Sequence, residues 1–262
     1  DFALLKDGKL IELHKEEETS NFQVGDIFIA KIRKPVAGLN AAFVNVAYEK
    51  DAFLHYHDLG PNLASQLKFI KLVSAGKIKD FSLKNFQFEK EIDKDGSITE
   101  IINSNQSILV QVVKEPISTK GPRISAELSL AGRYIVLVPF SDRVSISQKI
   151  ENKKEKERLK RLVQSVKPKG FGVIVRTVAE GKSTVELEKD LQNLIERWTA
   201  MCKKLPTAHH PSKVLGELNR ASSILRDVFN DTFSGIQIDD EELYNQTKDY
   251  LQEIAPSKQS IV

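Results

Sequence analysis

The sequence predicts an α+β protein in which a small β-barrel comes first and segments of α/β character follow. Two patterns favour this class. Short apolar runs punctuated by Gly and Pro recur between residues 24 and 138, as in small barrels. Apolar residues at the helical period become clear only from about residue 153 onward. With 40% hydrophobic and 29% charged residues, the chain can bury a core.

The composition excludes several classes of protein. The formal net charge of the 262 residues is only +3, so a nucleic-acid site has to come from local clusters of cations. Cys202 is the single cysteine, which excludes an internal disulfide and favours a reducing, cytoplasmic location. No apolar run reaches the roughly 20 residues of a membrane span, and the first residues lack the basic region of a signal peptide. Met201 is the only methionine, which predicts a processed or trimmed chain.

The first half of the chain predicts strands. Asp7-Gly8 between two apolar runs predicts a hairpin, which should join a sheet completed elsewhere. Barrel strands are expected at Ile27–Ala30, Ala42–Val46, Ala52–Leu54 and Ile108–Val113, with a turn from Pro35 to Asn40. Residues 61–104 show no clean period and predict a long, partly mobile insertion, whose lysines favour solubility over RNA contact.

The second half predicts an alternation of strands and helices. Strands are expected at Tyr134–Val138, Gly172–Thr177 and Ile236–Ile238. Helices are expected at Lys153–Lys167, from Ser183 with Glu186 completing a capping box, at about Ser212–Phe229 and at about Asp240–Ile254. The last of these segments could supply the layer that the first hairpin lacks.

Two aromatic residues mark the expected barrel. Phe43 and Phe53 fall on neighbouring strands, where a ring can stack on an unpaired base, a contact worth about 1–3 kcal/mol. Rings that fill the barrel would show the same spacing, and spacing alone favours that interpretation. The turn from Lys114 to Arg123 brings three cations together, counting Lys120, and is equally compatible with phosphate binding and with a solvated hairpin tip.

A third motif combines Arg176-Thr177 with Gly181-Lys182-Ser183. An arginine fork, a hydroxyl and a helix amino terminus suit a terminal phosphate. Gly181-Lys182-Ser183 lacks the upstream glycine of a nucleotide-binding P-loop, which excludes an ATPase of that type.

The sequence predicts neither a metal site nor a catalytic residue. His55 and His57 could pair on a metal, but no carboxylate or cysteine cluster accompanies them. The adjacent His209 and His210 are typical of a loop. The acidic run from Asp239 to Glu242 is better explained as the first turn of a helix, where acids complement the helix dipole.

Four blocks together resemble the RNase E/G family of endoribonucleases. They are 38–54, 108–112 with Lys120-Gly121, 129–137, and 175–177 with 181–183, in the family's order. The resemblance implies an RNase H-like subdomain split between residues 1–22 and 208–262. It also implies an OB-type RNA-binding domain at 23–125, with its insertion at about 61–104, and a 5′-sensor subdomain at 126–207.

The resemblance also implies roles for seven residues and a function. Phe43, Phe53 and Lys120 would hold single-stranded RNA, which raises the stacking interpretation above the barrel-filling one. Gly132 and Val136 would contact the terminal nucleotide, and Arg176 and Thr177 would bind its 5′-monophosphate. The expected function is RNA binding and 5′-end sensing in a single-strand-specific endoribonuclease of rRNA processing and mRNA decay. A non-catalytic OB-fold RNA-binding module and a purely structural scaffold are the alternatives.

The sequence departs from the family in what it does not contain. In the family, Mg²⁺ held by aspartates of a following DNase I-like domain cuts the RNA, and a cysteine motif that binds Zn²⁺ links the subunits. Neither region is present, so we expect this chain to bind RNA weakly without cutting it. The full-length enzyme would be a homo-oligomer, whereas this portion could be a monomer.

Overall fold

The chain folds into two compact units. The computed structural model describes residues 1–15, 22–117, 120–230 and 232–262. One unit joins Asp1–Asn21 to Leu218–Val262, and the other runs from Phe22 to Glu217. Within the described ranges, no helix combines the length and the apolar character needed to cross a bilayer.

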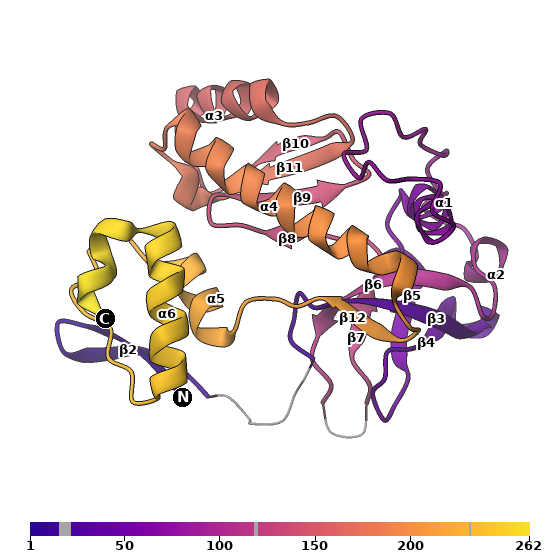
Figure 1. The fold of residues 1–262 in the computed structure, drawn as a ribbon, viewed down its shortest axis with the longest axis horizontal. Helices are drawn as coiled ribbons and strands as arrows, with labels where there is room; N and C mark the ends of the chain where they lie inside the picture. Colours follow the sequence, from indigo (N-terminus) through magenta and orange to yellow (C-terminus); the bar gives the residue numbers. More distant parts are fainter. Residues whose placement is uncertain (16–21, 118–119, 231) are drawn as a thin grey trace. The chain divides into compact units, whose positions relative to one another are not determined.

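The larger unit begins with a closed five-stranded β-barrel, consistent with an OB-type fold. Its strands are β3 (Ile27–Val36), β4 (Ala41–Asn45), β5 (Ala52–His55), β6 (Ser107–Lys114) and β7 (Arg123–Ser125). They pair in the order β3-β4-β5-β7-β6, and β6 closes the barrel onto β3 (Figure 1). The predicted turn at Pro35 begins later, because β3 continues to Val36 before the short helix η1 (Ala37–Leu39).

Alternation along β4 and β5 shows which of their side chains fill the barrel core. Ala42 and Val44 of β4 are buried, as are Ala52 and Leu54 of β5, while the residues between them are half-exposed. Side chains of successive strand residues point to opposite faces, so one set fills the barrel and the other faces outward.

The segment between β5 and β6 is more regular than predicted. It contains η2 (Tyr56–Asp58), α1 (Leu63–Ser74) and the short α2 (Ile98–Ile101). Leu63, Phe69, Ile70 and Val73 of α1 are buried. These residues follow a helical spacing that the intervening lysines and serines obscured, and burial against the rest of the unit stabilises the helix.

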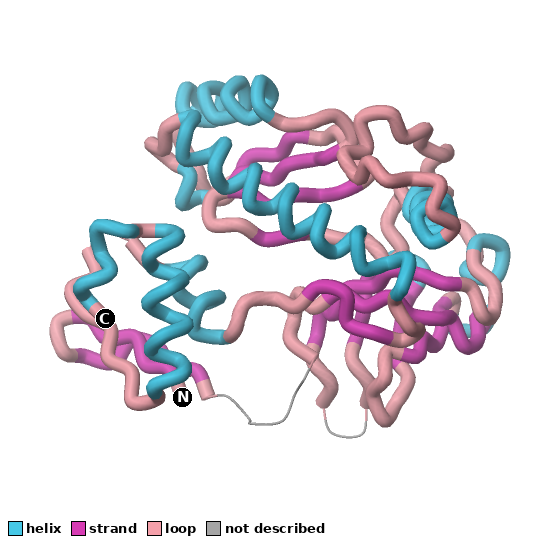
Figure 2. The backbone as a smooth tube through the Cα atoms, in the orientation of Figure 1, coloured by secondary structure: helices cyan, strands magenta, loops and turns pink. Residues whose placement is uncertain are grey.

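A second, smaller sheet follows the barrel in the same unit. It consists of β8 (Leu130–Ala131), β9 (Ile135–Pro139), β10 (Val144–Ile146) and β11 (Phe171–Val175), in the order β10-β11-β9-β8. The helices α3 (Lys153–Val166) and α4 (Thr184–Lys204) lie along this sheet (Figure 2). Their apolar stripes share one core with the inward side chains of β9 and β11, including Leu159, Trp198, Leu137 and Phe171.

The predictions for α3 and α4 are confirmed. The helix α3 ends at Val166, before Pro168, and α4 begins at the predicted capping box of Ser183 and Glu186. The helix η3 (Thr177–Ala179) links β11 to α4, and η4 (Leu205–Thr207) follows α4.

The predicted helix at Ser212–Phe229 is wrong in its first part. Ser212–Leu215 forms β12, which pairs antiparallel with β3, and the helix α5 covers only Arg220–Val228. Asn219 caps α5 through a hydrogen bond from Ser222 N at 2.8 Å, so the helix starts there.

The buried carboxylate of Asp26 joins the first and last residues of the larger unit. It accepts hydrogen bonds from Gln23 N at 3.0 Å and Glu217 N at 2.9 Å, and its Oδ2 lies 2.6 Å from Lys213 Nζ. A Cβ at Gly25 would lie 2.6 Å from Glu217 Oε2. The first turn and the last residues of this unit are therefore held side by side.

The smaller unit draws on both ends of the chain. The predicted hairpin is confirmed as β1 (Phe2–Lys6) and β2 (Lys9–His14), with Asp7 and Gly8 at positive φ in the turn. The helices are α5, α6 (Glu241–Ile254) and η5 (Pro256–Ile261), packed around Leu225, Phe229 and Leu251.

The predicted strand at Ile236–Ile238 does not form. Ile236 N donates to Ile261 O at 2.8 Å, and the Ile236 side chain packs against the helical cluster. Among the described residues, the hairpin therefore remains a two-stranded sheet, and the expectation that further strands complete it is wrong. The RNase H-like assignment of both chain ends stays a prediction.

Candidate nucleic-acid interface

The two predicted aromatic residues lie together on the outer face of the barrel. Phe43 of β4 and Phe53 of β5 are directly opposite in the strand register, with ring centroids 6.1 Å apart. Both are half-buried, and neither belongs to the barrel core. Part of each ring is therefore exposed and could contact a ligand. The interpretation that the two rings fill the barrel is wrong.

Basic residues on the neighbouring strands flank Phe43 and Phe53 and form a row with them across the outer face of the barrel. Lys34 of β3 is the register partner of Phe43, Arg123 of β7 that of Phe53, and Lys114 of β6 that of Arg123. All three are exposed. The row therefore places two rings between positive charges, the combination that grips a single strand by its bases and its phosphates. Lys34 was missed in the sequence, because alternation from the buried Ile32 would place it inward, and only a β-bulge between Ile32 and Lys34 brings it opposite Phe43.

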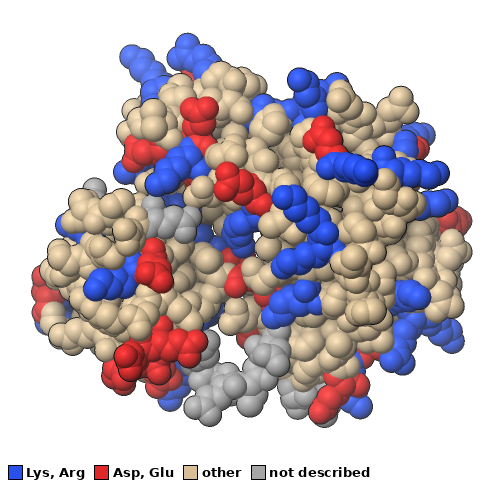
Figure 3. Space-filling model, in the orientation of Figure 1, with Lys and Arg blue, Asp and Glu red and all other residues tan. Residues whose placement is uncertain are grey.

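Arg123 is fixed by an acid beside the row. Its guanidinium forms a forked pair with Asp58, with Nε at 3.0 Å from Oδ2 and Nη2 at 3.1 Å from Oδ1. This neutralises the carboxylate at the end of the barrel face. On the side of the larger unit visible in Figure 3, lysine and arginine side chains are interrupted by acids, in keeping with the small net charge.

The turn that carries Lys120 lies against the start of β5. Phe53 N donates to Pro122 O at 3.1 Å, and a Cβ on Gly121 would lie only 2.4 Å from Asp51 O. Lys120 itself is exposed. The structure thus brings Lys120 close to Phe53 in the fold, whereas Ser118 and Thr119 of the predicted cationic turn lie outside the described residues.

The residues predicted to bind the 5′ end, Gly132, Val136, Arg176 and Thr177, lie where β9 begins and β11 ends. Arg176 Nη1 donates to Gly132 O at 2.8 Å, and Arg176 N donates to Tyr134 O at 2.8 Å. Thr177 Oγ1 lies 2.8 Å from Ser147 Oγ. Val136 is half-buried on β9, opposite Ala131 and Ile174. The arginine, the hydroxyl and the glycine turn therefore lie in one small region.

Asp190 of α4 organises this region and was not predicted. Its carboxylate accepts hydrogen bonds from three consecutive backbone N–H groups, those of Arg133 (3.0 Å), Tyr134 (2.8 Å) and Ile135 (3.0 Å). Burial raises the pKa of Asp190, while these donors and the Arg176 charge act in the opposite direction. A Cβ on Gly132 would lie 2.6 Å from its Oδ2, so only glycine fits there without displacement.

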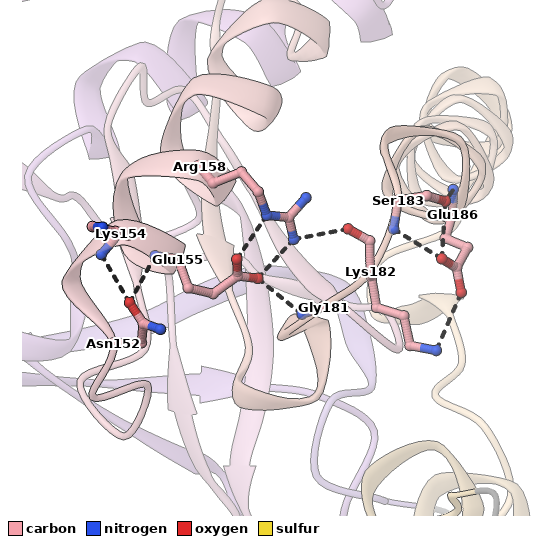
Figure 4. A network of polar contacts seen from close by, with 8 residues as sticks. All are labelled: Asn152, Lys154, Glu155, Arg158, Gly181, Lys182, Ser183 and Glu186. Atoms are coloured by element: carbon pink, nitrogen blue, oxygen red, sulfur yellow. Dashed lines mark hydrogen bonds and ion pairs between the residues drawn. The ribbon is translucent and has the colours of Figure 1, made fainter.

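A polar network fixes the turn at the start of α4. Glu155 of α3 accepts from Arg158 Nη2 at 2.6 Å and from Gly181 N at 2.8 Å, and Arg158 also donates to Lys182 O at 2.9 Å (Figure 4). The Arg158 and Gly181 donors lower the pKa of Glu155 to about 2. Lys182 Nζ is 3.2 Å from Glu186. The Gly181-Lys182-Ser183 motif therefore forms the turn before α4 and caps that helix.

The acidic residues between Asp239 and Glu242 lie at the start of a helix. Asp240 caps α6 by accepting from Leu243 N at 2.7 Å, and Glu241 and Glu242 lie in the first turn, as predicted. In the described part of the chain, no three His, Cys, Asp or Glu side chains gather as a metal site would require. The magnesium chemistry implied by the resemblance is therefore not assigned to these residues.

Comparison with known proteins decides the family. The model of the ribonuclease E/G family matches residues 129–262, just over half of the chain. The chain belongs to the ribonuclease E/G family. This match includes β8 to β11, the Gly132 turn and Arg176.

Relatives extend the similarity over the barrel. Ribonuclease G of Haemophilus influenzae is 32% identical over 254 residues, covering 97% of this chain and 48% of the relative. Ribonuclease G of Escherichia coli K12 is 31% identical over 258 residues, covering 98% and 49%. Ribonuclease E of Nostoc is 32% identical over 235 residues, covering 89% and 30%. The chain spans about half the length of the ribonucleases G that it matches.

Proposed function

We propose that this chain is the portion of a ribonuclease E/G that grips single-stranded RNA and senses its 5′ end. The observation that carries the proposal is the outer barrel face, where Phe43 and Phe53 lie side by side between cations. Stacking on rings tolerates any base, so the grip would be selective for unpaired strands and indifferent to their sequence. Such a grip suits a single-strand-specific endoribonuclease of rRNA processing and mRNA decay.

The region around Arg176 would bind the 5′-monophosphate. Gly132 O fixes one nitrogen of the guanidinium, and the next residue, Thr177, adds a hydroxyl that lies 2.8 Å from Ser147 Oγ. Gly132 and Val136 would contact the terminal nucleotide. A phosphate monoester is a compact anion that an arginine fork recognises through charge-assisted hydrogen bonds, each worth about 1.5–3 kcal/mol.

The experiment compares two RNAs of identical sequence, one with a 5′-monophosphate and one with a 5′-hydroxyl. Fluorescence anisotropy would give the Kd of each at a fixed salt concentration, since phosphate binding depends on salt. We expect the monophosphate to bind roughly tenfold more tightly, and Arg176→Ala to abolish that difference. Arg143→Ala is the matched control, because Arg143 is an exposed arginine just before β10.

The barrel is tested with the hydroxyl-ended RNA. Phe53→Ala should weaken binding by about fivefold or more, which is the lower end of a stacking contact, and Phe43→Ala should do the same. Lys120→Ala should weaken it less and flatten its salt dependence. Val185→Ala removes an exposed apolar side chain from α4 as the control. Unchanged binding in all three barrel variants would refute the proposed grip.

Cleavage is expected to require the rest of the enzyme. Mg²⁺ at aspartates of a further domain would cut the RNA, and Zn²⁺ would link subunits of the homo-oligomer. Incubation of this chain with 5′-monophosphorylated RNA and Mg²⁺ should leave the RNA intact, and robust cleavage would overturn this assignment. A non-catalytic OB-fold module would show RNA binding without any preference for the 5′-monophosphate.

A further inference from the structure

The helix α3 concentrates positive charge that the rest of the chain balances. Its 14 residues include six basic and two acidic side chains, which gives a formal charge of +4, whereas the whole chain carries only +3. Figure 3 shows lysine and arginine side chains projecting from the edge at which Figure 1 places this helix. A local cluster of cations of this kind is what a chain of small net charge needs in order to attract a polyanion.

Four exposed cations occupy one side of α3. Lys153 and Lys160 are seven residues apart, and so are Lys154 and Arg161. At a rise of about 1.5 Å per residue, the members of each pair lie roughly 10.5 Å apart along the helix axis. The helical period places all four on the side away from the buried Leu159. We call these four residues the basic face of α3.

The two acids of α3 do not neutralise the basic face. Glu155 is directed toward the turn before α4, where it accepts from Arg158 Nη2 and from Gly181 N (Figure 4). Glu157 lies among the four cations, but in the described part of the chain the ion pair of α3 is that of Glu155 with Arg158. The four cations therefore remain available to an external anion.

The side chains of the basic face suit the phosphates of paired RNA. The apolar residues of α3 face the core of the unit, where Leu159 and Val163 are buried and Leu162 and Val166 pack against them. The basic face itself has no ring to stack on an unpaired base and no apolar side chain to enter a bilayer. Double-stranded RNA turns its bases inward and is recognised mostly by its shape, its phosphates and its 2′-hydroxyls. A ring-free row of cations therefore fits a paired segment better than a single strand or a membrane.

We propose that the basic face of α3 binds the phosphate backbone of double-stranded RNA. The helix packs against β10 and α4, and it shares no residue with the barrel face or with the Arg176 region. The contact requires neither an unpaired base nor a 5′-monophosphate. An RNA with a folded segment would thus gain a second attachment, which depends on charge and not on sequence.

The probe is a blunt RNA duplex with 5′-hydroxyl ends, and fluorescence anisotropy over a salt series gives its Kd and the salt dependence. Replacing all four residues of the basic face by Gln should weaken binding about tenfold or more at low salt. The slope of log K against log salt should fall by roughly 3 to 4, about one for each lost phosphate contact. The opposite change, Glu157→Lys, should tighten binding and steepen the slope by about 1.

The control keeps the change in net charge and moves it to another surface. It replaces by Gln four exposed lysines of the segment between α1 and α2, which are Lys77, Lys79, Lys90 and Lys94. This variant should bind the duplex like the unmodified chain. All the replaced residues are exposed, so the fold should be kept, and the fluorescence of the buried Trp198 during urea unfolding checks this. Glu157→Lys tests the same surface by a gain of affinity.

The outcomes separate this surface from the barrel grip. Phe53→Ala should leave the Kd of the duplex unchanged, whatever it does to single-stranded RNA. If the basic-face variant binds the duplex as tightly as the control does, the α3 surface is refuted. If it loses a 5′-hydroxyl oligouridine as strongly as the duplex, the preference for paired RNA is refuted. If the unmodified chain ignores the duplex but binds phosphatidylglycerol vesicles through the same four residues, the partner is a membrane surface and the proposal is overturned.

Discussion

Asp190 offers the sharpest test of how the region around Arg176, the proposed 5′ sensor, is built. Its carboxylate receives three backbone hydrogen bonds, two at Oδ2 and one at Oδ1. In Asp190→Asn, the best amide orientation keeps the two bonds at Oδ2 and turns an NH₂ toward the N–H of Arg133. One hydrogen bond to a charged group is lost, worth roughly 1.5–3 kcal/mol. The neutral amide is easier to bury, so we expect a net loss of about 2 kcal/mol.

Trp198 provides the assay. It is the only tryptophan, it is fully buried, and it lies on the same helix as Asp190. Its fluorescence during urea and thermal unfolding therefore reports on the core beside the proposed sensor. A loss of about 2 kcal/mol should lower the thermal midpoint by roughly 4–8 °C. The control is Glu188→Gln, which changes charge equally at an exposed position of α4.

The same substitution should affect RNA recognition in a specific way. The Gly132 carbonyl orients Arg176, and Asp190 holds the turn that carries this carbonyl. Asp190→Asn should therefore reduce the preference for 5′-monophosphate while leaving the Kd for hydroxyl-ended RNA unchanged. A variant that kept both the urea midpoint and the 5′ preference of the unmodified chain would contradict this role of Asp190.

Three further predictions follow from the described geometry. Gly132→Ala should cost about 1–3 kcal/mol in urea unfolding, because its Cβ would meet the Asp190 carboxylate, whereas Gly38→Ala has open space and should be tolerated. Glu155 has a folded-state pKa of about 2 against an ordinary 4.5, so its contribution to stability is present above pH 4.5 and disappears as the pH falls toward 2. Stability profiles of Glu155→Gln and the unmodified chain should converge in that window, and parallel profiles would contradict this. Burial raises the pKa of Cys202, so a thiol reagent should label it only after unfolding; fast labelling of the native chain would oppose this.

Local patterns predicted the elements that depend on neighbours in sequence. The Asp7-Gly8 turn and the capping box at Ser183 are set by a few adjacent residues, and both form as expected. The strand at Ser212–Leu215 depends instead on pairing with β3, which is distant in sequence. Its apolar residues also fit a helix, so only the partner strand decides the structure.

The residues of the candidate site also divide into those that local patterns predict and those that depend on residues distant in sequence. Phe43 and Phe53 could be located from spacing, and strand alternation, once the strands are known, places them outside the barrel. For Arg176 and Thr177, the residue types predicted a terminal-phosphate site, and the family resemblance specified a 5′-monophosphate. Asp190 was missed although a signal existed, because it interrupts the apolar stripe of Leu187, Leu191 and Leu194 on α4. A carboxylate on a core-facing stripe needs partners, and here they are backbone donors from β9 and the turn before it.

The hydrogen bonds of Asp26, which join the two ends of the larger unit, have a consequence for how this chain can be divided. Because the larger unit enters and leaves at one point, its ends could be joined by a short linker or cut free together without crossing its core. Residues 22–217 thus form a natural cassette for expression, insertion into another host protein or circular permutation.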